Sequence, residues 1–482
     1  MVVSLNLEFK GYLMAHNTNL KPLLNQSSRT IGLEVEFLAV QLENGQAATR
    51  DLIKQIWCKW GQHDGVETYI DFGTKQPIGV IYTLPDQRQM KIDSDAGVSV
   101  IEFGFLPFPT LQACENNLKT IIKEFLDIAN SIGVGLISYG LQPQTPYYFP
   151  DLKTEKLWYR TFPRLYERGH SLFHNIAANQ PNIDVSVSEA LDVVNTFNAL
   201  SPLFIALFAN SGVGEWKIQN HLEEREWRWN EWLKDYPKIR GIPENPFDSL
   251  EAYFEYNWSI TLPAIHRHQD NTLHVIESNP KIIEYLQSNQ EWPTINVGQV
   301  TPSTIKPEIE DINQSLQYLW IQSRLKMEFD KNIMIDEVLD HWKNKSLMRY
   351  MELHLNKLFI ETRCISQQPW NDVIAPSALL LGLIENIEEA IKLVEMKPWG
   401  EWRALRENTL THSMKLPGIL PLLEKILTIS EIGLKRRGFG EESYLSPLKK
   451  RVKEGKSPAM KAIEVFKKQG MQGLLEEVLI RL

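Results

Sequence analysis

Apolar and acidic residues alternate in the first predicted strand. In RTIGLEVEF, residues 29–37, the acids Glu34 and Glu36 alternate with leucine, valine and phenylalanine. A period of two is typical of a β-strand, whose successive side chains point to opposite faces. Both acids should therefore lie on one face, only about 7 Å apart along the strand. On an arbitrary strand, such a pair could equally be part of a solvated face.

Two later strands also carry an acid among apolar neighbours. DSDAGVSVIEFGF (93–105) contains Glu102 after a turn, and FIETRC (359–364) contains Glu361, with Arg363 two residues later on the same face. A carboxylate among apolar side chains is costly to bury without a partner. Several such acids predict a shared partner of opposite charge. Mg²⁺ with a phosphate ligand is the simplest one, because it takes carboxylate and phosphate oxygens together.

The same patterns predict the remaining elements. We expect strands at 31–40, 77–84, 89–93, 98–106 and 358–365, and helices at 111–132, from 188 onward with a kink or break at Pro202, at 303–328, at 333–357 and throughout the chain after 375. Residues 240–300, rich in proline, asparagine and tryptophan, predict irregular surface structure. Because strands and helices do not alternate as βαβ units, we expect an α+β fold in which antiparallel strands gather the distant acids on one sheet face. We expect an N-terminal arm at 1–28, a catalytic α+β sheet region at 29–374, and a helical region at 375–482 packed on the same domain.

Composition excludes several classes of function. The net charge is −9 over 482 residues, which argues against a nucleic-acid partner because there is no broad basic excess. The three cysteines are widely spaced, which argues against a structural zinc site or a disulfide framework and fits a reducing compartment. The sequence shows no secretory h-region, and no apolar run approaches the 18 residues or so that a bilayer requires. These features predict a soluble, cytoplasmic protein with no membrane partner.

The common nucleotide and nucleophile motifs are missing. A GKS triplet occurs at 455–457, but the first glycine of a P-loop would fall at Lys450, and there is no GxGxxG or GxSxG. Any nucleotide should therefore be held by metals and arginines rather than by a glycine-rich turn. The histidines, including His170, His174 and His221, are expected to be surface or core residues rather than ligands.

Longer motifs carry a resemblance to a known family. Residues 179–229 contain Gln180-Pro-Asn182-Ile-Asp, then ALFANS (206–211), then Arg225. This order resembles the plant and proteobacterial type of glutamate–cysteine ligase, in which a Q-x-N-[IL]-D strand is followed by a helix ending in ANS and by an arginine-bearing strand.

Further segments resemble the same family from residue 29 to about residue 470. GLEVEF resembles its G-[IL]-E-x-E strand, VIEFGF its F-E-L segment, and FIETRCISQQPW its Y-L-E-M-R-G-A-D-G-G-P-W motif. Residues 434–466 are similar to its C-terminal L-x-R-R-G region.

The resemblance implies a glutamine-synthetase-like fold, in which an antiparallel sheet curves into a funnel with helices outside. It also implies a reaction that uses ATP and Mg²⁺ to join the γ-carboxylate of glutamate to the amine of cysteine through an acyl phosphate. The implied roles are metal ligation by Glu34, Glu36, Glu102, Glu361 and the amide oxygen of Gln180, contact with the transferring phosphate by Arg363, binding of the glutamate α-carboxylate by Arg225, and shaping of that pocket by Asn182. Asp95 is a weaker candidate. Arg225 could instead be a surface ion-pair member, and Glu34 or Glu36 a charge at the sheet edge.

Departures from the family keep other functions open. The Gly-Ala-Asp-Gly-Gly stretch is replaced at 364–368 by Cys-Ile-Ser-Gln-Gln, and residues 168–179 also differ. An amino-acid ligase with a different amine or acid, serving peptide or natural-product synthesis, is therefore one alternative. A non-catalytic, nucleotide-binding homologue is another, although retention of the other metal ligands argues against it.

Overall fold

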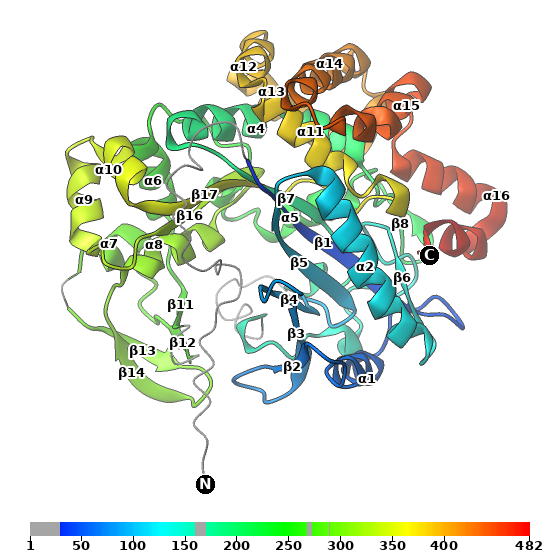
Figure 1. Ribbon diagram of the computed structural model, residues 1–482, viewed down its shortest axis with the longest axis horizontal. Helices are drawn as coiled ribbons and strands as arrows, with labels where there is room; N and C mark the ends of the chain where they lie inside the picture. The colour runs from blue at the N-terminus through cyan, green and yellow to red at the C-terminus, as the bar shows by residue number, and fades with distance from the viewer. Residues whose placement is uncertain (1–28, 160–169, 268–271, 289) are drawn as a thin grey trace.

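The computed structural model describes residues 29–159, 170–267, 272–288 and 290–482, so the predicted arm at 1–28 lies outside the described residues. The main sheet has nine strands in the order β16-β17-β7-β1-β5-β4-β3-β2, with β6 also paired to β1 (Figure 1). They are β1 (Ile31–Gln41), β2 (Val66–Ile70), β3 (Pro77–Thr83), β4 (Gln89–Ser94), β5 (Val100–Phe108), β6 (Val134–Ile137), β7 (Asn179–Asp184), β16 (Ser323–Phe329) and β17 (Leu355–Thr362). All of its strand pairs are antiparallel.

Strand β1 lies in the middle of this sheet and separates an apolar face from an acidic one. Leu33, Val35 and Phe37 are buried, and the ring of Phe37 meets that of Phe103 edge-on with centroids 5.9 Å apart. Helices α1 (Arg50–Trp60) and α2 (Leu111–Asn130) pack against this part of the sheet. The period-two pattern thus sends the acids of β1 to the face away from these side chains. The predicted α+β fold with helices outside an antiparallel sheet is confirmed.

Helix α4 (Val187–Phe208) runs behind strands β16 and β17 as a single helix. Its N-terminus has a capping box between Ser186 and Glu189. The predicted break at Pro202 is wrong, because the helix continues through it, and the alternative of a kink stays a prediction. Proline removes the N–H that would bond to the carbonyl of Asn198, but the Ser201 hydroxyl donates to that oxygen at 2.8 Å instead.

Helix α4 also corrects the prediction that no apolar run reaches membrane-spanning length. Among the described residues it is the one helix that is long and apolar enough to cross a bilayer. However, 83% of the apolar 18-residue stretch within it is buried inside the protein. Core helices of soluble proteins meet the same criterion, so this helix is weak evidence for a membrane.

The chain after residue 375 is helical, as predicted, and its helices lie beside the sheet at the upper right of Figure 1. They are α11 (Ala375–Ile384), α12 (Ile387–Glu395), α13 (Trp399–His412), α14 (Ile419–Arg437), α15 (Ser446–Glu454) and α16 (Pro458–Val478). Buried residues of these helices and of the sheet belong to one continuous hydrophobic core. The division into regions 29–374 and 375–482 stays a prediction.

The middle of the chain differs most from the predicted elements. Residues 240–300, predicted to be irregular, hold regular elements: α6 (Leu250–Trp258), α7 (Ile282–Leu286) and most of a four-stranded antiparallel sheet formed by β11 (Ala264–Arg267), β12 (Thr272–Val275), β13 (Trp292–Asn296) and β14 (Thr301–Ile305). A buried polar contact stabilises this unit, because Arg267 pairs with Asp311 and donates to the hydroxyl of Tyr285 at 3.1 Å.

The predicted helix at 303–328 is also mostly wrong. Only α8 (Ile309–Ser315) and the short 3₁₀ helix Leu316–Tyr318 are helical there, and the segment ends in strand β16. The sequence SRLKMEF of β16 alternates polar and apolar residues, which is the strand period. The prediction of helical structure at 333–357 is confirmed by α9 (Ile335–Lys343) and α10 (Leu347–His354), but its end is wrong because strand β17 already begins at Leu355.

Candidate functional site

Three carboxylates meet on the acidic face of the sheet. Glu36 of β1 lies directly opposite Glu102 of β5, and Glu34 lies opposite Gln180 of β7. Glu34, Glu36 and Glu102 each place a carboxylate oxygen within 4.8 Å of the others. The pairing of β1 with β5 therefore brings Glu102 to Glu36 and Glu34, which lie 66 and 68 residues earlier in the chain.

Gln180 links two of these acids through its amide group. Its Nε2 donates to Glu34 Oε1 at 2.9 Å and to Glu36 Oε1 at 3.2 Å. Its buried Oε1 has no hydrogen-bond partner among the described residues. Because the two ends of a side-chain amide have nearly the same shape, a half-turn would direct this oxygen toward the acids. That orientation would suit a cation held between them.

Burial and mutual repulsion make this acid group electrostatically costly. Burial, followed by the charge of Glu361, raises the pKa of Glu34 to about 8. Burial, followed by the charge of Asp95, raises the pKa of Glu36 to about 8. Burial and the charge of Glu34 raise the pKa of Glu102 well above its usual value. A divalent cation would remove this cost, and carboxylate and amide oxygens are ligands that Mg²⁺ accepts. The donor set therefore fits Mg²⁺.

Two aspartates flank the acid group but have other partners. Asp93 of β4 lies opposite Glu102, and its Oδ2 is 2.8 Å from the ammonium groups of both Lys91 and Lys156. Asp95, the weaker candidate from the sequence, accepts a hydrogen bond from the hydroxyl of Tyr159. Lys156 follows a segment that pairs with the turn at Gly97, so a basic residue from this segment lies beside the acids.

Glu361 lies on the same sheet face but is surrounded by cations. Its Oε2 accepts hydrogen bonds from Nε of Arg324 at 2.5 Å and from Nη1 of Arg363 at 3.0 Å. Its Oε1 is 3.7 Å from the Lys326 ammonium. Since these partners already occupy the carboxylate, the role of Glu361 as a metal ligand stays a prediction.

Arg324, Lys326 and Arg363, which we call the cation group, shift the pKa of Glu361 and are themselves shifted by their neighbours. Burial acts to raise the pKa of Glu361, but Arg324, Lys326 and Arg363 hold it well below its usual value. Burial and the charge of Arg324 lower the pKa of Lys326 to about 8. Burial acts against the charge of Arg363, but Glu361 raises its pKa above the usual value. The group thus holds three basic side chains around one carboxylate.

Arg225 is buried at the start of helix α5 (Glu224–Trp232). The predicted strand at this position is therefore wrong, and so is the alternative of a surface ion pair, because Arg225 is only 3% exposed. Its backbone N–H donates to Ser211 Oγ at 3.1 Å, at the end of the ALFANS segment. Its Nη1 pairs with Glu226 at 3.1 Å. The ALFANS motif thus fixes where α5 begins.

Arg225 and Arg363 line the same small pocket. Its other lining residues are Glu226, Trp229, Asn230, Arg240, Gly241, Trp320, Gln322 and Arg406. The Nε atoms of Arg225 and Arg406 and Oε1 of Gln322 are buried without a hydrogen-bond partner among the described residues. Four guanidinium groups against one carboxylate, with two unsatisfied N–H donors, suit an anionic ligand.

Asn182 lies between the acid group and the cation group. It is opposite Gly32 on one side and Glu361 on the other. Its Nδ2 donates to the carbonyl of Gln180 at 3.1 Å, and its side chain is half-buried. This places it at the sheet face where the predicted substrates would lie, and its role in substrate binding stays a prediction.

The replaced family stretch at 364–368 is packed inside the protein. Ser366 Oγ donates to Glu223 at 2.5 Å, and Gln367 Nε2 donates to the backbone carbonyl of Glu36 at 2.5 Å. Gln368 Oε1 accepts from Arg451 at 2.7 Å. All three side chains are fully buried. The substitution has therefore built an internal hydrogen-bond network behind the acids.

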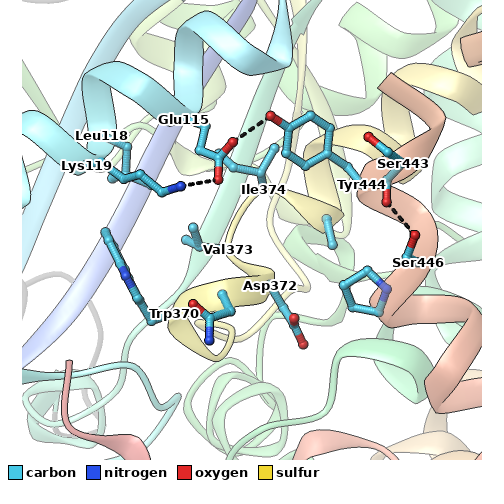
Figure 2. A pocket seen from close by; sticks show the side chains of 13 residues that line it. Glu115, Leu118, Lys119, Trp370, Asp372, Val373, Ile374, Ser443, Tyr444 and Ser446 are labelled. Atoms are coloured by element: carbon cyan, nitrogen blue, oxygen red, sulfur yellow. Dashed lines mark hydrogen bonds and ion pairs between the residues drawn. The ribbon is translucent and has the colours of Figure 1, made fainter. Parts of the chain in front are cut away.

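A larger cavity, of about 280 Å³, lies away from this site (Figure 2). It is bordered by Trp370, whose ring packs against Phe37 on the apolar side of β1 with centroids 6.0 Å apart. Glu115 in its wall is held by Lys119 at 2.6 Å and by the hydroxyl of Tyr444 at 2.6 Å. None of the predicted site residues lines this cavity.

Sequence reasoning missed several basic and polar residues of the site. Arg324 and Lys326 were hidden in a predicted helix, although the alternation in SRLKMEF could have revealed them. Arg406, on α13, and Gln322 carry no local signal, because only the tertiary fold brings them to Arg225.

Comparisons with known proteins assign the family. The sequence model of glutamate-cysteine ligase family 2 matches residues 30–479. The chain belongs to this family. The resemblance found in the sequence is therefore confirmed.

The relatives of this family member include plant enzymes. The chloroplastic glutamate–cysteine ligase of Medicago truncatula is 21% identical over 379 residues, covering 76% of this chain and 66% of the relative. That of Brassica juncea is 23% identical over 385 residues, covering 76% and 65%. The chain thus spans just under two thirds of the length of these relatives. Because they are chloroplastic, the cytoplasmic location stays a prediction.

A solved structure has the same fold. The glutamate–cysteine ligase of Francisella tularensis, in complex with AMP, superposes with a TM-score of 0.52 at 12% identity and covers 94% of this chain and 88% of that one. This likeness agrees with the predicted arrangement of an antiparallel sheet with helices outside.

Proposed function

We propose that this protein is an ATP- and Mg²⁺-dependent ligase that joins the γ-carboxylate of glutamate to the amine of cysteine through an acyl phosphate. The observation that carries the proposal is the meeting of Glu34, Glu36 and Glu102 within 4.8 Å on one sheet face, beside the cation group around Glu361. Membership of glutamate-cysteine ligase family 2 supports the same reaction.

The acid group would hold the metal. Glu34, Glu36 and Glu102 would supply carboxylate oxygens, Gln180 its amide oxygen, and Glu361 is the further predicted ligand. When bound, Mg²⁺ supplies positive charge that offsets the negative charge of the ATP phosphates. The sheet contributes rigidity, because each acid is fixed by strand pairing and the Glu36 carboxylate also accepts the Ala178 N–H at 2.7 Å.

The arginines would orient the anionic substrates. Arg363 offers a planar set of donors suited to a phosphoryl group, and Glu361 holds it in place. Arg225 would bind the α-carboxylate of glutamate in the pocket it shares with Arg363 and Arg406. Asn182 would act on the substrates from the sheet face, where it lies opposite Glu361. A carboxylate and a phosphoryl group would then be positioned side by side for phosphoryl transfer.

A nucleotide fits this proposal in two ways. The Francisella tularensis enzyme of the same fold was solved with AMP, which supports a nucleotide site here. The absence of a P-loop motif agrees with phosphate binding by metal and arginines.

The test measures ADP formation by the purified protein with Mg²⁺, ATP, glutamate and a panel of amines. We expect ADP to form fastest with cysteine, and Glu36→Gln to abolish it while Glu43→Gln, at an exposed position, retains it. A clear preference for another amine would favour the alternative amino-acid ligase. Nucleotide binding with no amine-dependent ADP formation would overturn the proposal in favour of the non-catalytic homologue.

A further inference from the structure

Lys326 differs from its two basic neighbours in how it is bound. Nη1 of Arg324 donates to the carbonyls of Leu316, Gln317 and Leu319 at 2.9–3.0 Å while its Nε holds Glu361. Arg324 is therefore fixed in the structure. The Lys326 ammonium makes only the 3.7 Å ion pair with Glu361 among the described residues.

Within ion-pair distance, charge is unbalanced around Glu361, and Glu34 is a further carboxylate whose charge acts on Lys326. Arg324, Lys326 and Arg363 bring three positive charges to the single carboxylate of Glu361. All are largely withdrawn from water, with side-chain exposures of 5%, 17% and 14%. Excess positive charge that is buried without a partner is costly. An anion arriving at this position would offset that cost.

The position of Lys326 on the sheet indicates which anion. β16 is the edge strand next to β17, and β7 separates β17 from β1. Lys326 and the acids of β1 therefore lie on either side of Asn182 and Glu361. An anion over β7 and β17 would face a metal on the acids at one end and Lys326 at the other. On the proposed function, the group that meets the metal there is the terminal phosphoryl of ATP.

We propose that Lys326 binds the terminal phosphoryl group of ATP and stays in contact with it during transfer to the acid substrate. This inference rests on the proposed function and adds a phosphate-binding residue from β16. In the balanced step, an oxygen of the substrate carboxylate attacks the γ-phosphorus, the bond from phosphorus to the β,γ-bridging oxygen breaks, and ADP leaves with that electron pair. Lys326 donates hydrogen bonds to a non-bridging oxygen throughout and loses no proton.

The test compares binding of Mg·ATP and Mg·ADP, in the absence of glutamate, to the wild type and three variants. Lys326→Met should weaken Mg·ATP binding by about tenfold or more, the value of one charge-assisted hydrogen bond, and leave Mg·ADP binding unchanged. Lys326→Arg should restore part of the difference. Lys357→Met is the matched control, because Lys357 lies on the neighbouring strand and pairs with Glu328 at 3.4 Å.

Turnover gives a second readout. Loss of a donor to a transferring group lowers kcat by about 10²–10³-fold, so Lys326→Met should show this loss at saturating ATP. The inference about Lys326 would be overturned if Lys326→Met weakened Mg·ATP and Mg·ADP binding equally, or if it bound both nucleotides and turned over like the wild type. The proposed function would still stand in that case, provided that the wild type is active. If Lys326→Met selectively lost Mg·ATP binding but the wild type had no ligase activity, the role of Lys326 in phosphate binding would be supported and the proposed function refuted. A wild type that binds neither nucleotide would refute both.

Discussion

Glu36 of β1 and Glu102 of β5 lie directly opposite each other in an antiparallel sheet. Like charges at such a position are destabilising, and burial raises the pKa of both side chains. A fold selected for stability alone would not keep this pair. On the proposed function, a cation bound by both strands would offset this repulsion.

The first prediction concerns Glu36→Gln in a metal-free buffer. A carboxyl group whose pKa rises on folding from 4.5 to about 8 binds its proton more tightly in the folded state. Ionisation of Glu36 therefore lowers the free energy of unfolding progressively as the pH rises from about 4.5 to 8. We expect Glu36→Gln to match the wild type near pH 5 and to exceed its free energy of unfolding by about 2–4 kcal/mol at pH 9.

Denaturant unfolding in EDTA at both pH values would check this difference. Added Mg²⁺ should stabilise the wild type at pH 9 and should have little effect on Glu36→Gln. Glu43→Gln, which removes the same charge from an exposed position, should follow the wild type. A variant less stable than the wild type at pH 9 would contradict the argument.

The second prediction concerns Arg324, whose guanidinium joins Glu361 to three backbone carbonyls. Arg324→Leu would leave those carbonyls without their donor and remove the shortest ion pair of Glu361. We expect a loss of about 3–5 kcal/mol in the free energy of unfolding. Urea unfolding of this variant, beside Arg349→Leu at an exposed position, would show whether the loss is specific. A change below about 1 kcal/mol would mean that Arg324 does not fix the edge of the sheet.

The acids of the site were predictable because strand periodicity is a local signal. Glu34, Glu36 and Glu102 each interrupt an apolar strand, and their partnership follows once the strands are paired. Arg324 and Lys326 carry the same signal, but a helix was predicted over their segment.

Other site features depend on contacts that no local pattern encodes. Arg225 was found through the family resemblance, yet its segment is the helix α5 and not a strand, and its backbone N–H is bound by Ser211 at the end of the ALFANS segment. Arg406 reaches Glu226 from a helix 180 residues away. The internal packing of Gln367 likewise depends on the position of β1, which lies more than 300 residues earlier.

The third prediction concerns Gln367, which connects the replaced family stretch to the metal-binding strand. Its Nε2 donates to the Glu36 carbonyl at 2.5 Å, and its Oε1 accepts the Gln368 N–H at 2.7 Å. Gln367→Ala would leave both groups buried without partners, so we expect a loss of about 1–3 kcal/mol in stability. Because β1 would be less firmly held, the Mg²⁺ concentration needed for half-maximal ADP formation should rise as well. Gln46→Ala, at an exposed position, is the control, and an unchanged Mg²⁺ requirement would separate Gln367 from the metal site.

The fourth prediction concerns Arg225, which we propose to bind the α-carboxylate of glutamate. Its Nη1 is held by Glu226 at 3.1 Å while its buried Nε has no partner among the described residues, so a donor remains for a ligand. Arg225→Lys keeps the charge but removes the planar pair of donors. We expect it to raise the KM for glutamate about 10-fold to 100-fold, the effect of one charge-assisted hydrogen bond, with little change in the KM for ATP. Steady-state kinetics would check this, with Arg403→Lys on the exposed side of α13 as the control. Equal increases in both KM values would indicate that Arg225 supports the pocket as a whole and does not select the acid substrate.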